Sequence, residues 1–369
     1  MIHIIVVLSL LLPIPMPLIA IAIGVGYGLI KYFRIILKHL FTHKMILALF
    51  GIGTIGSLLS QNTAGLIVVM LLFGLWIYFI TLSQEMTSFL FEGATSVLLI
   101  ASWFHAGYAL LQHLKIFFGP DYHAWHESMI SWRDGRADSV FLNPNYYAFM
   151  CVVYILIALY KAQTSQAKVR YYLTILINML GVVFTQSRTA FAVIFIVIFT
   201  FYYCALPHSQ RKWLRIGAIG TLAISPLFQL LPRFDYGTIV AHLVDIRFEI
   251  WQVSLHAFLK RAFFGYGPFA YRMLHTTYGS YPTQHAHNLY IDSLLNYGIV
   301  GVILLICVLV WLIKRMMPLR STHTPLFALG MSCIALILTH GLLDVSILFV
   351  HTLSVMGFLF IYMLKKEAH

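Results

Sequence analysis

Residues 62–83 read NTAGLIVVMLLFGLWIYFITLS. The run contains no charged side chain, and a helix that crosses the hydrocarbon core of a bilayer needs roughly 20 consecutive apolar residues. A helix that is apolar on every side has no face for water, so lipid or other apolar helices must surround it. The stretch therefore predicts a transmembrane helix and an integral membrane protein.

Similar apolar runs, separated by short polar turns, occupy most of the remaining chain. Residues 1–30 contain three prolines, so they are expected to form either one kinked helix or two short ones. The expected fold is an all-α polytopic membrane protein of about 11–12 transmembrane helices, with a single transmembrane domain over residues 1–369. The other predicted spans are 44–60, 62–83, 89–112, 141–160, 171–186, 189–206, 213–231, 289–313, 325–341 and 344–364.

The overall composition agrees with a membrane location. Hydrophobic residues make up 60% of the chain and charged residues 10%, whereas a soluble domain has about 25% charged residues. The net charge of +12 does not indicate nucleic-acid binding, because most Lys and Arg residues lie in the short turns between apolar runs. The first 30 residues lack a basic start and an A-x-A cleavage site, so they are expected to stay in the membrane. The cysteines show no metal-ligand spacing and are interpreted as packing residues: Cys151, Cys204, Cys307 and Cys333.

The basic residues predict an orientation. Most of them lie in alternate loops, which the positive-inside rule places in the cytoplasm together with the C-terminus. The two long polar segments, about 113–140 and 232–288, then lie outside the membrane as loops. Nine basic residues depart from the rule, so they suggest a functional role: Lys115, Arg133, Arg136, Arg188, Arg233, Arg247, Lys260, Arg261 and Arg272.

Three predicted helices start at this outer side with polar sequences. They are Asn143-Pro144-Asn145, Thr185-Gln186-Ser187-Arg188-Thr189 and His285-Ala286-His287-Asn288. Asn143, Ser187 and Asn288 suit the N-cap position. A helix N-terminus presents free N–H groups and a partial positive charge, which favour an anion such as phosphate.

Each of these residues also has a plainer interpretation. Arg188 can extend to lipid headgroups, His287 can be an ordinary interfacial histidine, and Asn143 can be a simple cap. Composition and spacing alone thus predict an outward-facing cationic site suited to a phosphate-bearing ligand at the membrane surface.

An ordered set of short motifs resembles the O-antigen ligase and O-antigen polymerase superfamily over about residues 140–345. The motifs are Asn143-Pro144-Asn145, Gln186-Ser187-Arg188-Thr189-Ala190, Asp245-Ile246-Arg247 followed by Trp251, Gly265-Tyr266-Gly267, His285 to Tyr290, and Tyr297 to Gly301. The resemblance implies a GT-C-type glycosyltransferase of the bacterial cytoplasmic membrane. Such enzymes transfer a glycan from an undecaprenyl diphosphate carrier to a glycan or lipid-glycan acceptor at the outer face, without a metal or another cofactor.

The resemblance also implies the site residues. Arg188, Arg247 and His287 are expected to be catalytic, with His287 acting either as a base or as a phosphate ligand. His285, which precedes His287, is expected to be the more solvated of the two. Many members have Glu before the Gly-x-x-Gly tail where this chain has Asn296-Tyr297. The expected substrate-binding residues are Asn143, Asn145, Ser187, His285, Asn288, Tyr266 and Arg272.

Several function classes remain open at this point. The family motifs do not separate a ligase from a repeat-unit polymerase, since the two differ in the acceptor. A transporter of lipid-linked oligosaccharides is a second possibility, although few ionisable residues fall within the predicted spans and no internal repeat is evident. A non-catalytic scaffold leaves Arg188, Arg247 and His287 without a role.

Overall fold

The computed structural model describes residues 2–114, 136–212, 214–216 and 236–367, with the backbone alone over 236–245. This described part contains helices and no strand, so the predicted all-α class is confirmed. Its fourteen α-helices are α1 (Ile2–Ser9), α2 (Met16–Thr42), α3 (Lys44–Leu59), α4 (Thr63–Glu85), α5 (Ser88–His113), α6 (Pro144–Thr164), α7 (Lys168–Thr185), α8 (Arg188–Ala205), α10 (Tyr236–Lys260), α11 (Ala270–Tyr278), α12 (Leu289–Met316), α13 (Leu319–Thr322), α14 (Thr324–His340) and α15 (Val350–Glu367).

Six stretches among these residues are long and apolar enough to cross a membrane: α2, α4, α5, α6, α8 and the stretch Leu289–Thr322. The chain is therefore a multi-pass membrane protein. The helices α3 and α14 are apolar but shorter. Residues 1–30 contain two helices rather than one, and the second continues to Thr42. The span predicted at 213–231 lies almost entirely outside the described residues, as does most of the predicted loop 113–140.

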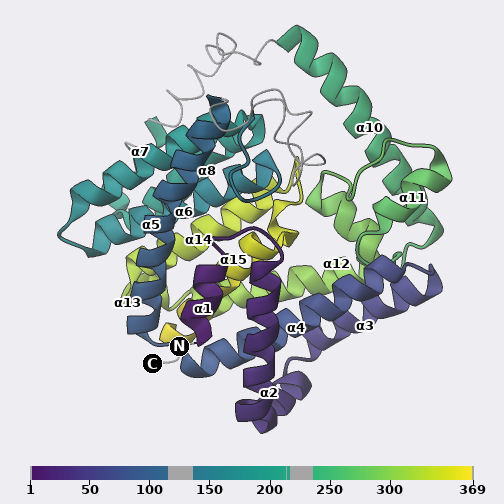
Figure 1. Cartoon of the computed structure of the whole chain (residues 1–369), viewed down its shortest axis with the longest axis horizontal. Coiled ribbons are helices and arrows are strands. Elements are labelled where there is room, and N and C mark those ends of the chain that lie inside the picture. Colours follow the sequence, from purple (N-terminus) through teal and green to yellow (C-terminus); the bar gives the residue numbers. More distant parts are fainter. Residues whose placement is uncertain (1, 115–135, 213, 217–235, 368–369) are drawn as a thin grey trace.

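The described helices form two groups with α1, α2 and α15 between them (Figure 1). In one group, α6 packs against α5, α7, α8 and α14. The α6 side chains from Tyr147 to Ala158 are all essentially inaccessible, because neighbouring helices cover every face. In the other group, α12 packs against α3 and α10.

The predicted loop at 232–288 is largely helical rather than irregular, because it contains α10 and α11. The turn between them is bonded to a break in α12 at Gly298, which has φ 63°. There the Ile299 N–H donates to the Ala262 carbonyl (2.8 Å), and the Gly267 N–H donates to the Asn296 carbonyl (2.8 Å). These bonds fix α10 and α11 onto α12, and so position the segment that leads to the His285 motif.

The Gly265-Tyr266-Gly267 motif also contacts the N-terminal half of the chain. The Asn62 side chain donates to the Pro268 carbonyl (2.8 Å), and the Ser60 hydroxyl donates to the Tyr266 carbonyl (2.7 Å). A Cβ at Gly267 would lie 1.9 Å from Ser57 Oγ, so only glycine permits this approach. The motif therefore joins α10 and α11 to α3 and α4.

Candidate functional site

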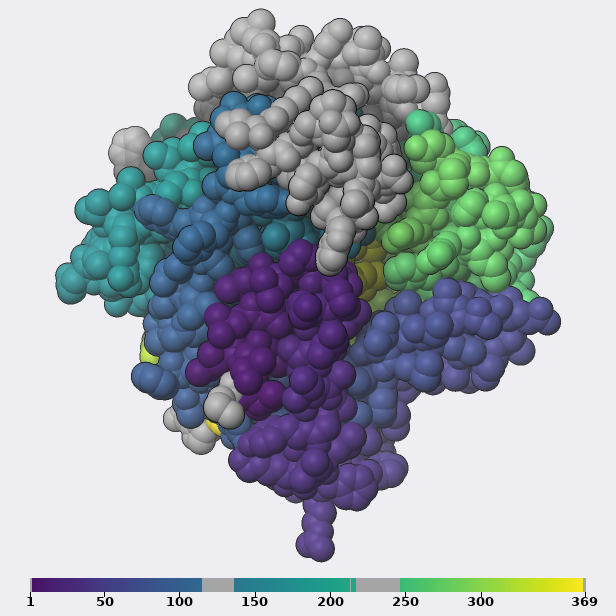
Figure 2. Space-filling model, in the orientation of Figure 1, coloured from purple at the N-terminus to yellow at the C-terminus, as the bar shows by residue number. Residues whose placement is uncertain are grey.

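A cavity of about 1290 Å³ lies between the two groups of helices. Figure 2 shows its opening between the purple N-terminal segment and the green segment that contains α10 and α11. One wall is apolar and comes mainly from α2 and α4, with Leu18, Ile21, Leu71 and Leu75 among its residues. The polar lining residues form what we call the polar wall, and they include Arg136, Asn143, Asn145, Tyr146, Arg247, Thr283, Gln284, His285, His287 and Asp292.

The three predicted helix starts meet at the polar wall. Asn145, in the first turn of α6, is the link between them. Its Oδ1 accepts hydrogen bonds from Ser187 Oγ (3.1 Å) and Arg136 Nη2 (3.1 Å), and its Nδ2 donates to Asp344 Oδ2 (2.5 Å). Asp344 lies after α14 and faces the His285 motif, which precedes α12. Residues nearly 200 positions apart are therefore joined through a single amide.

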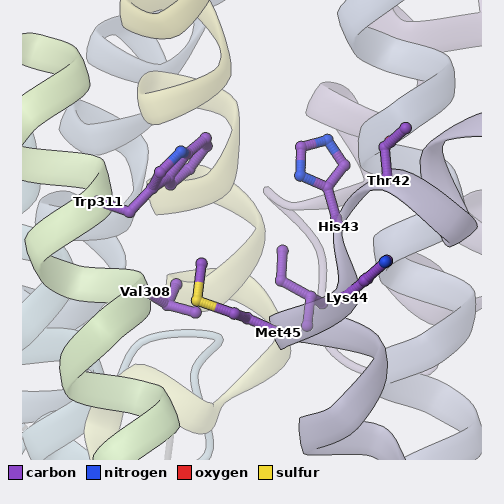
Figure 3. A pocket seen from close by; sticks show the side chains of 7 residues that line it. Thr42, His43, Lys44, Met45, Val308 and Trp311 are labelled. Atoms are coloured by element: carbon purple, nitrogen blue, oxygen red, sulfur yellow. The ribbon is translucent and has the colours of Figure 1, made fainter.

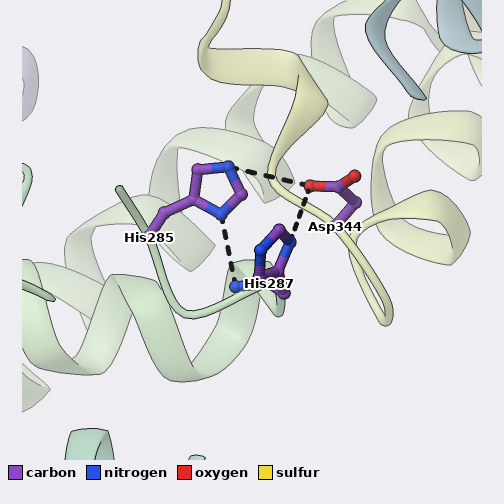
Figure 4. Close-up of side chains that lie close together, drawn as sticks. All are labelled: His285, His287 and Asp344. Carbon is purple, nitrogen blue, oxygen red and sulfur yellow. Dashed lines mark hydrogen bonds and ion pairs between the residues drawn. The ribbon is translucent and has the colours of Figure 1, made fainter. Parts of the chain in front are cut away.

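His285, His287 and Asp344 form a cluster beside this amide (Figure 4). Asp344 Oδ1 lies 3.5 Å from His287 Nδ1 and 3.8 Å from His285 Nε2. The Asp344 side chain is 1% exposed, compared with 12% for His285 and 24% for His287. The expectation that His285 is the more solvated histidine is therefore wrong, because the Tyr146 hydroxyl and the carboxylate enclose its ring.

The backbone that carries the two histidines is held from both sides. Trp251 Nε1 donates to the Ala286 carbonyl (3.0 Å), while the Ala286 N–H donates to Asp292 Oδ1 (2.9 Å). Asn288 Nδ2 donates to the Leu342 carbonyl (3.0 Å). These bonds hold His287 at φ 48°, a conformation that is unfavourable for a residue with a side chain.

The electrostatic environment differs between His285 and Asp344. Burial lowers the pKa of His285 to about 4, and the charges of His287 and Arg247 act in the same direction, whereas Asp344 opposes them. For Asp344, burial alone would raise the pKa, but the neighbouring histidines outweigh it and hold the pKa well below its usual range. At neutral pH, His285 is thus uncharged and Asp344 is a carboxylate.

Arg247 brings a positive charge into the same wall. It lies on α10, lines the cavity, and is partly buried. Burial lowers its pKa, whereas Asp344 acts in the opposite direction. An arginine has such a high pKa that it keeps its charge in proteins. The polar wall therefore offers a fixed guanidinium next to a histidine pair.

The same cluster contains three atoms of the kind that bind metals. One ligand atom each from His285, His287 and Asp344 lies within 4.8 Å of the others. Arg247 opposes a cation there, because its charge acts on both His285 and Asp344. The geometry alone permits a metal ion, and metal independence stays a prediction.

Free N–H groups were expected at the helix starts, and for α6 and α12 this expectation is wrong. Asn143 and Asn288 do cap these helices, as predicted. Their Oδ1 atoms accept from Asn145 N, and from Tyr290 N and Ile291 N, respectively. Leu289 N donates to the Gly341 carbonyl (2.7 Å). An anion at this wall must therefore be bound by side chains.

The start of α8 also differs from the prediction. Ser187 occupies the N-cap position, but its hydroxyl makes no capping bond and donates to Asn145 instead. Arg188 lies in the first turn, as expected, and is half-buried with an interaction partner within the chain. It is not among the described residues that line the cavity.

The predicted site residues thus divide into those that line the large cavity and those that do not, and Arg188, Ser187 and Asn288 belong to the second set. His287, Arg247, His285, Asn143 and Asn145 line one cavity. Tyr266 is 7% exposed within a small apolar cluster, and Arg272 is exposed on α11. Neither residue lines the cavity among the described residues, so their binding roles stay predictions.

Among the residues of the polar wall and the histidine cluster, Asp344, Asp292, Arg136 and Tyr146 were not predicted as site residues. Asp344 and Asp292 are acidic groups in otherwise apolar runs, a rare placement that often marks function in membrane proteins. Arg136 was recognised only as a departure from the positive-inside rule. Tyr146 carried no signal beyond its place in the Asn143 motif.

A second cavity of about 190 Å³ lies at the junction of α2 and α3, where it faces α12 (Figure 3). None of the predicted site residues lines it. Its lining residues are Thr42, His43, Lys44, Met45, Ile46, Val308 and Trp311.

Comparison with protein families identifies part of the chain. Residues 173–306 match the family Wzy_C, described as O-Antigen ligase, and no curated protein matches the chain. The resemblance inferred from the sequence motifs is therefore confirmed for this region. The matched region includes Arg188, Arg247, His285 and His287 and runs from α7 into α12. The chain is thus a multi-pass membrane protein whose residues 173–306 match the O-antigen ligase family.

Proposed function

We propose that this protein transfers a glycan from an undecaprenyl diphosphate carrier to an acceptor sugar at the outer face of the bacterial cytoplasmic membrane. The observation that carries the proposal is the composition of the large cavity. Its apolar wall suits a polyprenyl chain, and its polar wall contains Arg247 and the histidine cluster. A lipid-linked donor has the same division between an apolar chain and a charged head.

The negative charge that develops on the leaving group gives an arginine in this cavity a catalytic role. As the bond between the sugar C1 and its oxygen breaks, the diphosphate takes the electron pair and negative charge grows on that oxygen. A guanidinium fixed in a partly dry wall stabilises this charge more in the transition state than in the ground state. Arg247 is the residue we assign to this role, because it lines the cavity and its guanidinium can contact two phosphate oxygens at once.

The acceptor hydroxyl must lose its proton as its oxygen attacks C1. His287 Nδ1 faces the Asp344 carboxylate, which only accepts hydrogen bonds, so the ring proton lies on Nδ1. Nε2 is then an acceptor, and the Thr283 hydroxyl donates to it (3.1 Å). We assign Nε2 as the base that receives the acceptor's proton, with Asp344 stabilising the resulting imidazolium. The other role considered for His287, a hydrogen-bond donor to phosphate, would need a proton on Nε2.

The proposal is tested with purified protein in liposomes that contain a defined undecaprenyl diphosphate glycan and candidate acceptors. Wild-type protein should transfer the glycan, in the presence of EDTA as well. Arg247→Ala should lower kcat by roughly 10²–10³-fold, by analogy with the loss of an oxyanion-hole donor. Arg247→Lys should restore little, because an ammonium group lacks the paired donors. Arg320→Ala removes an exposed arginine of α13 that lies outside the cavity, and its activity should match wild type.

The same assay distinguishes a ligase from a repeat-unit polymerase and from a transporter. Transfer to a lipid-linked glycan of the same kind would make the protein a repeat-unit polymerase, whereas transfer to a different acceptor would make it a ligase. Movement of the donor across the bilayer without any transfer would contradict the proposal and support a transporter. Full activity of Arg247→Ala would contradict the assigned site.

A further inference from the structure

We infer that His285, His287 and Asp344 form a zinc site, and that zinc bound there inhibits glycan transfer. The site itself follows from the geometry of the cluster, whereas the inhibition rests on the proposed function. The region that matches the O-antigen ligase family ends before Asp344, so the family comparison does not assign this set of three side chains.

The three side chains offer the kinds of atom that zinc prefers. Two are imidazole nitrogens and one is a carboxylate oxygen. Such a set occurs in zinc sites with three protein ligands, where a water molecule takes the fourth position. Mg²⁺ and Ca²⁺ prefer oxygen ligands alone, so the two histidines disfavour them. The cluster therefore selects zinc over the common hard cations.

The separations of these atoms match a tetrahedral site. Zinc bonds of about 2.1 Å at tetrahedral angles place neighbouring ligand atoms about 3.4 Å apart. Asp344 Oδ1 lies 3.5 Å from His287 Nδ1 and 3.8 Å from His285 Nε2, and the three atoms lie within 4.8 Å of one another (Figure 4). An ion among them thus needs only small rotations of the side chains.

His287 Nδ1 gives a second indication of a ligand. This atom is inaccessible and makes no hydrogen bond within the described part of the chain. Asp344 Oδ1 faces it from 3.5 Å, which is long for a hydrogen bond. A buried polar atom without a partner costs free energy, and a bound ion would remove this cost.

The carboxylate of the site is already oriented. Asn145 Nδ2 donates to Asp344 Oδ2 (2.5 Å), and the Val345 N–H donates to Oδ1 (2.7 Å). One lone pair of Oδ1 remains for the ion, because a carboxylate oxygen has two. Partners of this kind orient metal ligands, and losing one typically lowers metal affinity by roughly 10–100-fold.

Zinc at this site would remove the proposed base. Zinc binds a nitrogen lone pair, so on His287 it takes Nδ1 and the ring proton moves to Nε2. Nε2 then donates to the Thr283 hydroxyl and has no lone pair for the proton of the acceptor sugar. On His285 zinc takes Nε2, and the proton moves to Nδ1, which ends the long bond from the His287 N–H (3.3 Å). Each ring keeps one proton, so the exchange releases none.

Arg247 gives the site a specific signature. Its positive charge acts on Asp344 and on His285, and so it opposes a cation between them. Arg247→Ala should therefore strengthen zinc binding, although the same change should weaken transfer. A loss of folding would instead weaken both.

Zinc binding is measured with purified protein in detergent, after EDTA treatment, buffer exchange and dialysis against defined Zn²⁺ concentrations. Wild type should retain zinc, and Mg²⁺ should not compete. His285→Gln and His287→Gln should each lower the affinity at least ~100-fold, because loss of an outer partner alone already costs roughly 10–100-fold. If either variant does not fold, Arg247→Ala decides: an affinity that is unchanged or lower would overturn the inference.

Two histidines elsewhere in the chain serve as controls. His275 lies on α11 and is not among the described residues that line either cavity, so His275→Gln should bind zinc as wild type does. His43 pairs with His39, and their ring nitrogens lie 3.2 Å apart, which makes this pair a competing place for zinc. Zinc binding that is lost in His43→Gln but kept in His287→Gln would overturn the inference. So would a wild type that retains no more zinc than a variant with both His285→Gln and His287→Gln.

The inhibition is measured in the liposome transfer assay. Added Zn²⁺ should lower the rate of wild type, EDTA should restore it, and His285→Gln should need at least ~100-fold more zinc for the same fractional loss. If zinc binds at the cluster and transfer is unaffected, the inhibitory role is wrong. If EDTA abolishes transfer and zinc restores it, both the inhibitory role and the assignment of His287 as the base are wrong. If wild type transfers no glycan under any condition, the proposed function fails, while the binding measurement still decides on the zinc site.

Discussion

His285 and His287 have different hydrogen-bond partners, and these partners assign different tautomers to the two rings. The backbone N–H of His287 donates to His285 Nδ1 (3.3 Å), so the neutral His285 ring carries its proton on Nε2, next to the Tyr146 hydroxyl. For His287 we assign the proton to Nδ1, because this nitrogen lies 3.5 Å from Asp344 Oδ1 and a carboxylate only accepts hydrogen bonds. Within this pair, only His287 presents an unprotonated Nε2 to the cavity, where Thr283 donates to it.

The pH dependence of transfer should therefore belong to His287. Because only an unprotonated Nε2 accepts a proton, the rate should fall as the pH is lowered. The pKa of His285 is about 4, so its ring stays neutral above about pH 5 and its protonation contributes nothing to that fall. His287→Gln should lose roughly 10²–10⁴ in rate together with the acidic limb of the profile.

The control for this experiment is His285→Gln, measured as a pH–rate profile in the same liposomes. It should keep the acidic limb even if its maximal rate is reduced. A rate that falls instead as the pH is raised would show that His287 acts as a cationic donor to phosphate. If His287→Gln kept its full rate and His285→Gln were inactive, the assignment of His287 as the base would be wrong.

At the scale of elements, the break in α12 connects the family motifs to the site. Gly298 interrupts the helix, and the residues around it exchange backbone hydrogen bonds with the turn between α10 and α11. Asn296 donates to Asp292 Oδ2 (2.7 Å) and accepts from Ala270 N (3.3 Å). This part of the motif set therefore forms a structural joint, by which we mean the hydrogen-bonded contact between the break in α12 and the turn between α10 and α11.

Gly298→Ala should destabilise this joint. The backbone at Gly298 has φ 63°, and a Cβ there would lie 2.3 Å from the Phe263 carbonyl oxygen. The strain and the clash together should cost at least ~2 kcal/mol. Gly51→Ala is the matched control, because a Cβ at Gly51 meets nothing within 4 Å and alanine favours a helix. Thermal unfolding in detergent compares the two variants, and equal midpoints would contradict the proposed joint.

The helices could be predicted from the sequence, because long apolar runs leave the chain few alternatives in a membrane. Most of the described spans were found near their predicted bounds, but α2 continues to Thr42, α15 begins only at Val350, and α10 and α11 lie in a segment predicted as a loop. The site could be predicted only in part. Asn145 and His287 belong to recognisable motifs, but Asp344 meets them through packing of α14 against α6 and α12. No local pattern indicates a contact between residues so distant in sequence.

At the scale of the whole molecule, the apolar and polar walls of the large cavity indicate how the cavity is oriented in the bilayer. The apolar wall comes from α2 and α4, both of which are candidate membrane spans. The polar wall lies where α6, α8 and α12 begin. A ligand with an apolar chain and a charged head would thus place its head at one end of the spans. Which side of the membrane this end faces decides whether the proposed reaction is extracytoplasmic.

The positive-inside rule predicts that this end faces outward, and α11 offers a direct test. Thr277 is exposed next to the C-terminus of α11, and Gln166 is exposed in the turn between α6 and α7. In a background without the four native cysteines, Thr277→Cys should react with a membrane-impermeant maleimide in intact spheroplasts. Gln166→Cys should react only after permeabilisation, because the positive-inside rule predicts that the turn with Lys161, Lys168 and Arg170 is cytoplasmic. The reverse pattern would place the cavity's polar end inside the cell, where an outer-face transfer reaction is impossible.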